Sequence, residues 1–211
     1  MKVGIIGSGG REHALCVSLE KSEIIEKIYC VPGNAGTNQI AENVNIDISD
    51  FKKLTSFVKE KKIEIVLVGP EKPLVDGIVD HLENENVKVF GPNKFASQLE
   101  GSKIFTKKIC KKYEIPTAKF EIYNDKEKAH SFFKNCNFPV VVKADGLAAG
   151  KGVYICEKED EAKQAVNEIF GGKFGVSKEV LIEEFLDGEE MSFFIISDGL
   201  SFKEFGTAQD H

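Results

Sequence analysis

The residues best suited to chemistry lie in the second half of the sequence. Residues 143–153 read KADGLAAGKGV, a lysine and a glycine-rich stretch that directly follow the apolar residues 139–142. Glycine loses the most conformational freedom when it is ordered, so such a loop weakens a fold unless a ligand approaches its backbone closely. Phosphate groups are common ligands of loop N–H groups. The stretch therefore predicts a phosphate-binding loop that includes Gly150, Lys151 and Gly152.

Other charged residues in this half stand in an order that suits a nucleotide. Lys103 lies in a basic segment, Lys143 ends an apolar run, and residues 183–190 read EEFLDGEE. Lysines neutralise phosphates, and a carboxylate accepts hydrogen bonds from ribose hydroxyls. Lys143 is the strongest of these candidates, because an ammonium at the end of a buried strand is costly to desolvate without an anionic partner. For the weaker candidates the alternatives are solvated surface charges at Lys151 and Glu189, and core residues at Phe185 and Leu186.

A glycine-rich turn near the N-terminus is a second candidate for anion binding. Residues 6–13 read IGSGGREH, where an apolar strand ends and a helix begins. A helix N-terminus presents free N–H groups and a positive dipole end, so Gly9, Gly10 and Arg11 suit a phosphate, with a plain tight turn as the alternative. Dinucleotide binding is disfavoured, because Glu12 replaces the third glycine of the fingerprint and residues 31–34 lack a ribose-binding acid. His13 is interpreted as a packing residue.

Glu71 follows another apolar run, in the segment VGPEKPLVDG of residues 68–77. Ligands of open parallel sheets bind beyond the carboxyl ends of the strands, so we expect Glu71 to share a crevice with the turn after residue 6. A carboxylate there suits sugar hydroxyls or an ammonium. The alternative is a surface turn punctuated by prolines.

Composition sets limits on the kind of protein. The 211 residues are 42% hydrophobic and 29% charged, enough for one large domain or two small ones. A formal net charge of -6 disfavours nucleic-acid binding, and the pairs at 107–108 and 111–112 are interpreted as a solvated helix face. Five scattered cysteines and four scattered histidines predict neither a disulfide framework nor a metal site. Without a signal sequence or a membrane-spanning stretch, the expected location is the cytoplasm.

The elements that must position these residues alternate between strand and helix. In the first unit we expect strands at residues 2–6, 27–31, 63–68 and 87–90, and helices at 11–21 and 50–61. This βαβ order is typical of a parallel, Rossmann-like sheet covered on both faces. In a second unit, from about residue 100, we expect helices at 102–113, 125–135 and 158–169, and strands at 118–122, 140–143, 153–156, 180–185 and 191–197. The fold class is α/β, with a small α+β lid in the second unit.

These motifs together resemble a known family. VVVKADGLAAGKGV and VLIEEFLDGEEMSFFIISDG are similar to the ATP-grasp fold. With MKVGIIGSGGREHAL, VPGNAGT, VGPEKPLVDG, GSKIFTK and AQDH, the whole chain resembles the phosphoribosylamine-glycine ligase family. The resemblance implies a Rossmann-like domain at 1–100 and the first part of an ATP-grasp domain at 101–211, with a lid at about 117–190. It also implies ATP-dependent ligation of glycine to 5-phosphoribosylamine by a monomer, early in purine synthesis.

The resemblance also implies roles for single residues. Lys103 and Lys143 match phosphate-binding lysines that serve catalysis, and Glu190 matches the carboxylate on the nucleotide ribose. Gly9, Gly10, Arg11 and Glu71 would lie on the phosphoribosylamine side, with Asp210 and His211 near the acceptor amine. The hinge that receives adenine is matched by Glu183, Glu184, Phe185 and Leu186.

Two departures from the family pattern matter. Residues 203–207 read KEFGT where the family is usually proline-rich, and the sequence stops at His211, about halfway through such a ligase. The ligands for Mg²⁺ or Mn²⁺ are therefore expected beyond residue 211, and the 211 residues alone are expected to lack turnover. A different ATP-grasp ligase or carboxylase, and a nucleotide-binding module without turnover, are the alternatives.

Overall fold

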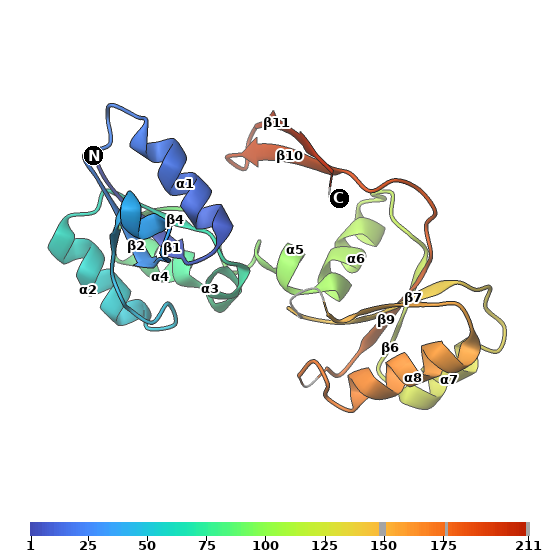
Figure 1. Ribbon diagram of the computed structural model, residues 1–211. Coiled ribbons are helices and arrows are strands. Elements are labelled where there is room, and N and C mark those ends of the chain that lie inside the picture. The colour runs from blue at the N-terminus through green and yellow to red at the C-terminus, as the bar shows by residue number, and fades with distance from the viewer. Residues whose placement is uncertain (148–150, 176, 210–211) are drawn as a thin grey trace.

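The computed structural model of the chain describes residues 1–147, 151–175 and 177–209 (Figure 1). Its first sheet is parallel and has five strands in the order β3-β2-β1-β4-β5. The strands are β1 (Lys2–Gly7), β2 (Lys27–Pro32), β3 (Glu42–Asn43), β4 (Ile65–Val68) and β5 (Lys88–Phe90). The parallel sheet of the prediction is confirmed, with β3 as a short edge strand that the sequence pattern did not indicate.

Helices cover both faces of this sheet. The helices of this unit are α1 (Gly10–Glu20), η1 (Thr37–Gln39), α2 (Phe51–Lys61), α3 (Glu71–Asp76) and α4 (Ile78–Asn84). Leu54 of α2 and Leu82 of α4 belong to one buried cluster together with Ile6 of the sheet. On the other face, Cys16 of α1 packs with Ile5. Successive residues of β1 thus point into opposite cores, which explains why its apolar run is continuous.

The segment after β4 forms two helices that the sequence pattern did not predict, in place of the proline-punctuated turn that was considered there. Pro70 is the extended residue before α3, and Gly77, with φ of +99°, ends α3 before α4 begins. Proline is tolerated in the first turn of a helix, because the N–H groups there have no intrahelical acceptor. Glu71 is therefore the first residue of a helix and not part of a loose turn.

The second unit contains an antiparallel sheet of four strands in the order β6-β9-β7-β8. Its strands are β6 (Phe120–Tyr123), β7 (Val140–Ala144), β8 (Val153–Cys156) and β9 (Val180–Glu184), and its helices are α5 (Gln98–Gly101), α6 (Lys103–Lys112), α7 (Lys126–Phe132) and α8 (Glu159–Phe170). Val140 and Val142 pack against α7 and α8 in one buried cluster. Lys143 therefore lies on the other face of β7, because side chains alternate along a strand.

Two further strands, β10 (Ser192–Ser197) and β11 (Phe202–Ala208), pair only with each other in the described part of the chain. All residues of both strands are exposed, including Phe193 and Phe205. β11 was not predicted, because its sequence FKEFGTA alternates poorly between apolar and polar residues. No helix among the described residues is long and apolar enough to cross a bilayer.

Candidate functional site

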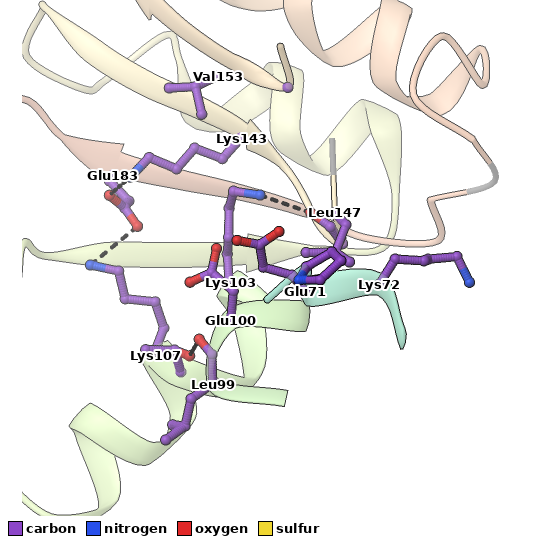
Figure 2. Close-up of a pocket in the computed structure, with 14 residues that line it drawn as sticks. Glu71, Lys72, Leu99, Glu100, Lys103, Lys107, Lys143, Leu147, Val153 and Glu183 are labelled. Atoms are coloured by element: carbon purple, nitrogen blue, oxygen red, sulfur yellow. Dashed lines mark hydrogen bonds and ion pairs between the residues drawn. The ribbon is translucent and has the colours of Figure 1, made fainter. Parts of the chain in front are cut away.

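A cavity of about 810 Å³ lies where the first unit meets the second (Figure 2). The start of α3 contributes Glu71 to its wall, α6 contributes Lys103 and Lys107, and the second sheet contributes Lys143 and Glu183. The remaining lining residues are Pro70, Lys72, Leu99, Glu100, Thr106, Gly146, Leu147, Gly152 and Val153. The cavity thus joins the two segments that the sequence singled out, the glycine-rich loop and the end of β4.

Lys143 meets its anionic partner inside the chain. Its Nζ donates to Oε2 of Glu183 at 2.7 Å. In the antiparallel pair of β7 and β9, Glu183 is opposite Val141, so it is the diagonal neighbour of Lys143 on the same face. The side chain of Glu183 is 5% exposed and that of Lys143 is 25% exposed. Glu183 is therefore the anionic partner that the burial of Lys143 requires. Lys143 nevertheless borders the cavity.

Lys107 also lies in this wall, and here the sequence interpretation was wrong. Its side chain is 12% exposed, and its Nζ is 3.1 Å from Oε1 of Glu183 in an ion pair that lacks hydrogen-bond geometry. The exposed residues Lys108, Lys111 and Lys112 do form the solvated face that was predicted. A usable signal existed, because Lys107 follows Lys103 by four residues and so shares its helix face.

The start of the glycine-rich loop is tied to the start of α6. Asp145 accepts hydrogen bonds from Ser102 Oγ at 3.0 Å and from the N–H of Ile104 at 3.1 Å. Ser102 is the N-cap residue of α6 and accepts from the N–H of Phe105. The Lys103 Nζ donates to the Gly146 carbonyl at 2.9 Å. The loop and the lysine that the sequence predicted as partners thus share one hydrogen-bonded junction.

Arg11 connects the N-terminal turn to the cavity. Its guanidinium donates to the Gly69 carbonyl and to Oε1 of Glu71, both at 2.8 Å. The hydrogen bond between Arg11 and Glu71 holds the pKa of the Glu71 carboxyl below its ordinary value and raises the pKa of Arg11. Arg11 thus brings Glu71 into contact with this turn, while among these residues only Glu71 lines the cavity. Glu71 therefore enters the cavity as a carboxylate already paired with a cation.

Glu12 explains the glycines that surround it. Its carboxylate is buried and accepts from the N–H of Gly9 at 2.6 Å. A Cβ on Gly69 would collide with this carboxylate, and Gly7 has φ of +131°, which other residues adopt only with strain. Asn34 closes the turn by donating to the carbonyls of Ser8 and Gly9. The Glu12 carboxylate therefore fills the space beside these glycines and occupies the N–H group of Gly9. In a dinucleotide fingerprint both are left free for the ligand.

Two family models cover the chain. The model described as "Phosphoribosylglycinamide synthetase, N domain" matches residues 1–100, and "Phosphoribosylglycinamide synthetase, ATP-grasp (A) domain" matches residues 101–211. The chain belongs to the phosphoribosylglycinamide synthetase family. The family resemblance expected from the motifs, and the ATP-grasp character of the second half, are confirmed.

Relatives in the synthetase family are similar in sequence to this chain over its whole length. The phosphoribosylamine-glycine ligases of Mesorhizobium japonicum and Brucella melitensis are 51% and 50% identical over 212 residues, which is 100% of this chain and 50% of each relative. The crystal structure of phosphoribosylamine-glycine ligase from Thermotoga maritima has 35% identity and a TM-score of 0.82, and it covers 98% of this chain and 49% of its own. The chain therefore spans about half the length of the relatives it matches.

Several residues that the synthetase resemblance singles out lie outside the cavity. Lys151, Phe185, Leu186 and Glu190 are exposed, and Glu184 accepts from the N–H of Lys119 at 2.8 Å. Gly9 and Gly10 are exposed at the start of α1. His13 packs against Gly36, as expected of a packing residue. Gly150, Asp210 and His211 lie outside the described residues.

The described residues do not fit a divalent metal ion by themselves. None of their His, Cys, Asp and Glu side chains form a group of three or more that could hold a metal. In the cavity, the Glu183 and Glu71 carboxylates are already paired with Lys143 and Arg11. The phosphates of a nucleotide fit better, since cations and backbone groups surround the same space.

Proposed function

We propose that this chain provides the nucleotide-binding part of an ATP-dependent ligase that joins glycine to 5-phosphoribosylamine. The products would be glycinamide ribonucleotide, ADP and phosphate, as in an early step of purine synthesis. One observation carries the proposal: Lys103 and Lys143, from two different elements, border one cavity together with the start of a glycine-rich loop. Family membership and the names of the relatives support it.

The proposed reaction has two steps. A glycine carboxylate oxygen attacks the γ-phosphorus of ATP, the bond from that phosphorus to the bridging oxygen breaks, and ADP leaves. The amine nitrogen of phosphoribosylamine then attacks the carbonyl carbon of glycyl phosphate, phosphate leaves, and the nitrogen loses a proton as the amide forms. Alignment and charge neutralisation supply most of the acceleration in phosphoryl transfer.

The chain's own residues would divide this work. Lys103 and Lys143 would hold the phosphates, and Lys103 would exchange the Gly146 carbonyl for a phosphate oxygen when the nucleotide enters. The glycine-rich loop, including Gly150, Lys151 and Gly152, would cover the phosphates and exclude water from the acyl phosphate. The adenine would meet the hinge of residues 183–186, partly through the backbone of Phe185 and Leu186, and its ribose would meet Glu190.

The remaining substrates are assigned to the first unit and to the end of the sequence. Gly9, Gly10, Arg11 and Glu71 would lie on the phosphoribosylamine side, with Asp210 and His211 near the acceptor amine. The paired state of Glu71 suits contact with sugar hydroxyls, since a carboxylate fixed by Arg11 still offers acceptor sites. We further propose a cytoplasmic monomer that acts on small molecules and not on nucleic acid.

A divalent cation completes the proposal. When bound, Mg²⁺ or Mn²⁺ would neutralise charge on the transferring phosphoryl group. Following the family resemblance, we assign its ligands to sequence beyond residue 211; the described residues offer no suitable group of ligands.

The second candidate function is nucleotide binding without turnover. It is favoured by the extent of the match, since this chain spans half the length of its relatives. Calorimetric titration of the chain with ATP, with and without Mg²⁺, and an ADP-release assay with glycine and phosphoribosylamine separate the two.

We expect binding without ADP release for the chain alone, and glycine-dependent ADP release when the C-terminal half of the Mesorhizobium japonicum relative is added. Release from the chain alone would show that its metal ligands have been misplaced. No nucleotide binding at all would refute both candidates.

A further inference from the structure

Lys107 occupies an unusual place for a lysine in a basic run. Its Nζ donates to Thr117 Oγ1 at 2.5 Å and to the Ala118 carbonyl at 3.4 Å, and it lies 5.5 Å from the centre of the Phe120 ring. With the ion pair to Glu183, contacts from two directions hold the ammonium in the cavity wall. A phosphate could reach it only after these contacts break. An effect of Lys107 on a ligand would therefore pass through its neighbours.

The neighbours form a chain of three charges. Glu183 presents Oε2 to Lys143 at 2.7 Å and Oε1 to Lys107 at 3.1 Å (Figure 2). Two ammonium groups on one carboxylate leave a net charge of +1 in this cluster. If an uncharged side chain replaced Lys107, Lys143 and Glu183 would form a pair without net charge. The surplus positive charge that the cluster offers to the cavity thus depends on Lys107.

The same cluster has a second consequence when an anion arrives. A phosphate that binds Lys143 competes with Glu183 for the same ammonium. Since Glu183 is 5% exposed, a carboxylate left without a partner there is strongly unfavourable. Lys107 stays in contact with the other oxygen of Glu183, so the carboxylate remains compensated while Lys143 turns to the ligand.

We propose that Lys107 is a positioning residue of the nucleotide site, which compensates Glu183 and thereby keeps Lys143 available to phosphate. This inference rests on the proposed function. It assigns Lys107 no contact with the nucleotide, and it predicts that the effect of Lys107 depends on the number of phosphates. The affinity for adenosine, which carries no phosphate, should not depend on Lys107.

The test compares ligands that differ only in phosphate number. Calorimetric titrations with ATP, ADP, AMP and adenosine are made on the 211-residue chain and on Lys107→Met, Lys107→Arg and Lys108→Met. We expect Lys107→Met to weaken ATP binding about tenfold or more, since Lys143 could then bind phosphate only by leaving the buried Glu183 carboxylate without a cation, and to leave adenosine binding unchanged. Lys107→Arg should bind ATP much more tightly than Lys107→Met. Lys108→Met, which removes the exposed lysine next along the helix, should match the wild type.

A double variant separates electrostatics from damage to the fold. Lys107→Met with Glu183→Gln removes one ammonium and the carboxylate together, so that Lys143 again carries an uncompensated charge. We expect ATP affinity to recover towards the wild type relative to Lys107→Met. Equal ATP binding by Lys107→Met and wild type, equal losses for ATP and adenosine, or no recovery in the double variant would overturn the proposal. Absence of ATP binding by the wild type would instead refute the proposed function, and this inference with it.

Discussion

At the scale of single residues, the cavity shows how a lysine on a buried strand is compensated before any ligand arrives. Lys143 pairs with Glu183, and Glu183 is shared with Lys107. Removal of one partner from a buried pair is strongly destabilising only when the other is left unpaired. Because Glu183 has two cations, the loss of Lys143 leaves it paired. Lys143 can therefore be tested for function without a large effect on folding.

We predict that Lys143→Ala weakens ATP binding by about ten- to a hundredfold, since a hydrogen bond to a charged group contributes about 1.5–3 kcal/mol. Titration calorimetry measures the affinity, and circular dichroism checks the fold. Lys126→Ala is the matched control, because Lys126 is exposed on α7, which covers the opposite face of the same sheet. Unchanged ATP affinity in Lys143→Ala would exclude this lysine from the phosphate site.

At the scale of elements, the junction of α6 with the glycine-rich loop has two functions at once. The Asp145 carboxylate accepts from Ser102 Oγ and from the N–H of Ile104, so it satisfies the first turn of α6. It also fixes the loop residue next to Gly146, whose carbonyl accepts from Lys103. One side chain thus stabilises the helix and positions the lysine.

We predict that Asp145→Ala lowers the free energy of unfolding by about 1–2 kcal/mol, as for the loss of a side-chain acceptor at a helix start, and also weakens ATP binding. Asp50→Ala is the matched control, because Asp50 caps α2 by accepting from the N–H of Lys53, away from the cavity. Both variants should unfold at lower temperature, but only Asp145→Ala should bind ATP more weakly. If both variants bind ATP like the wild type, Asp145 serves only to stabilise the start of α6.

Another contact network joins α8 to its neighbours and should respond to pH. Glu168 accepts from Lys173 and from the hydroxyl of Tyr154, and these bonds, with a smaller contribution from Gln164, lower its pKa from 4.5 to about 2. The unfolded chain then binds more protons than the folded chain at intermediate pH. The resulting stabilisation is fully present above pH 4.5 and is lost as the pH falls towards 2.

We predict that the melting temperature of Glu168→Gln falls less between pH 6 and pH 3 than that of the wild type. The amide does not titrate, whereas the wild type begins to lose the Glu168 contribution once the pH falls below 4.5. Scanning calorimetry at both pH values gives the comparison. Glu127→Gln, at an exposed position on α7, should retain the wild-type pH dependence. The same pH dependence in Glu168→Gln and wild type would mean that the Glu168 network does not stabilise the fold.

The elements that the sequence predicts well are those with strong local signals. The apolar runs and caps indicated β1, α2 and α8 to within two residues, because periodicity and capping are encoded nearby in the chain. α3 was not predicted, because Pro70 and Pro73 indicated a turn at this place.

The site was harder to predict, because its geometry depends on register. Glu183 was grouped with the hinge by its place in the sequence, and only the pairing of β9 with β7 brings it to Lys143. Lys107 was assigned to solvent because charged runs usually are solvated. Its burial depends on contacts with residues 117–120 and with Glu183, and the only local signal is its four-residue spacing from Lys103.

At the scale of the whole molecule, the cavity borders two units with separate cores. Residues of α2 and α4 pack with the parallel sheet, and residues of α7 and α8 pack with the antiparallel sheet. Among the residues that the structure describes, the two cores share none, although Glu71 from one unit and Lys143 from the other line the same cavity. A ligand between such units would stabilise both by mass action. We propose a domain boundary near residue 100 on this basis.

We predict that the two units respond separately to cavities made in their cores. Leu54→Ala should lower the stability of residues 1–100 by about 2–5 kcal/mol, and Ile169→Ala should do the same for the second unit, because both side chains are fully buried. Amide hydrogen exchange followed by mass spectrometry measures the exchange rates of both units in the same sample. Exchange should accelerate only in the unit that carries the substitution, and Lys52→Ala, on the exposed side of α2, should accelerate neither. Faster exchange in both units after either substitution would mean that the chain folds as one cooperative unit, and the boundary near residue 100 would have to be abandoned.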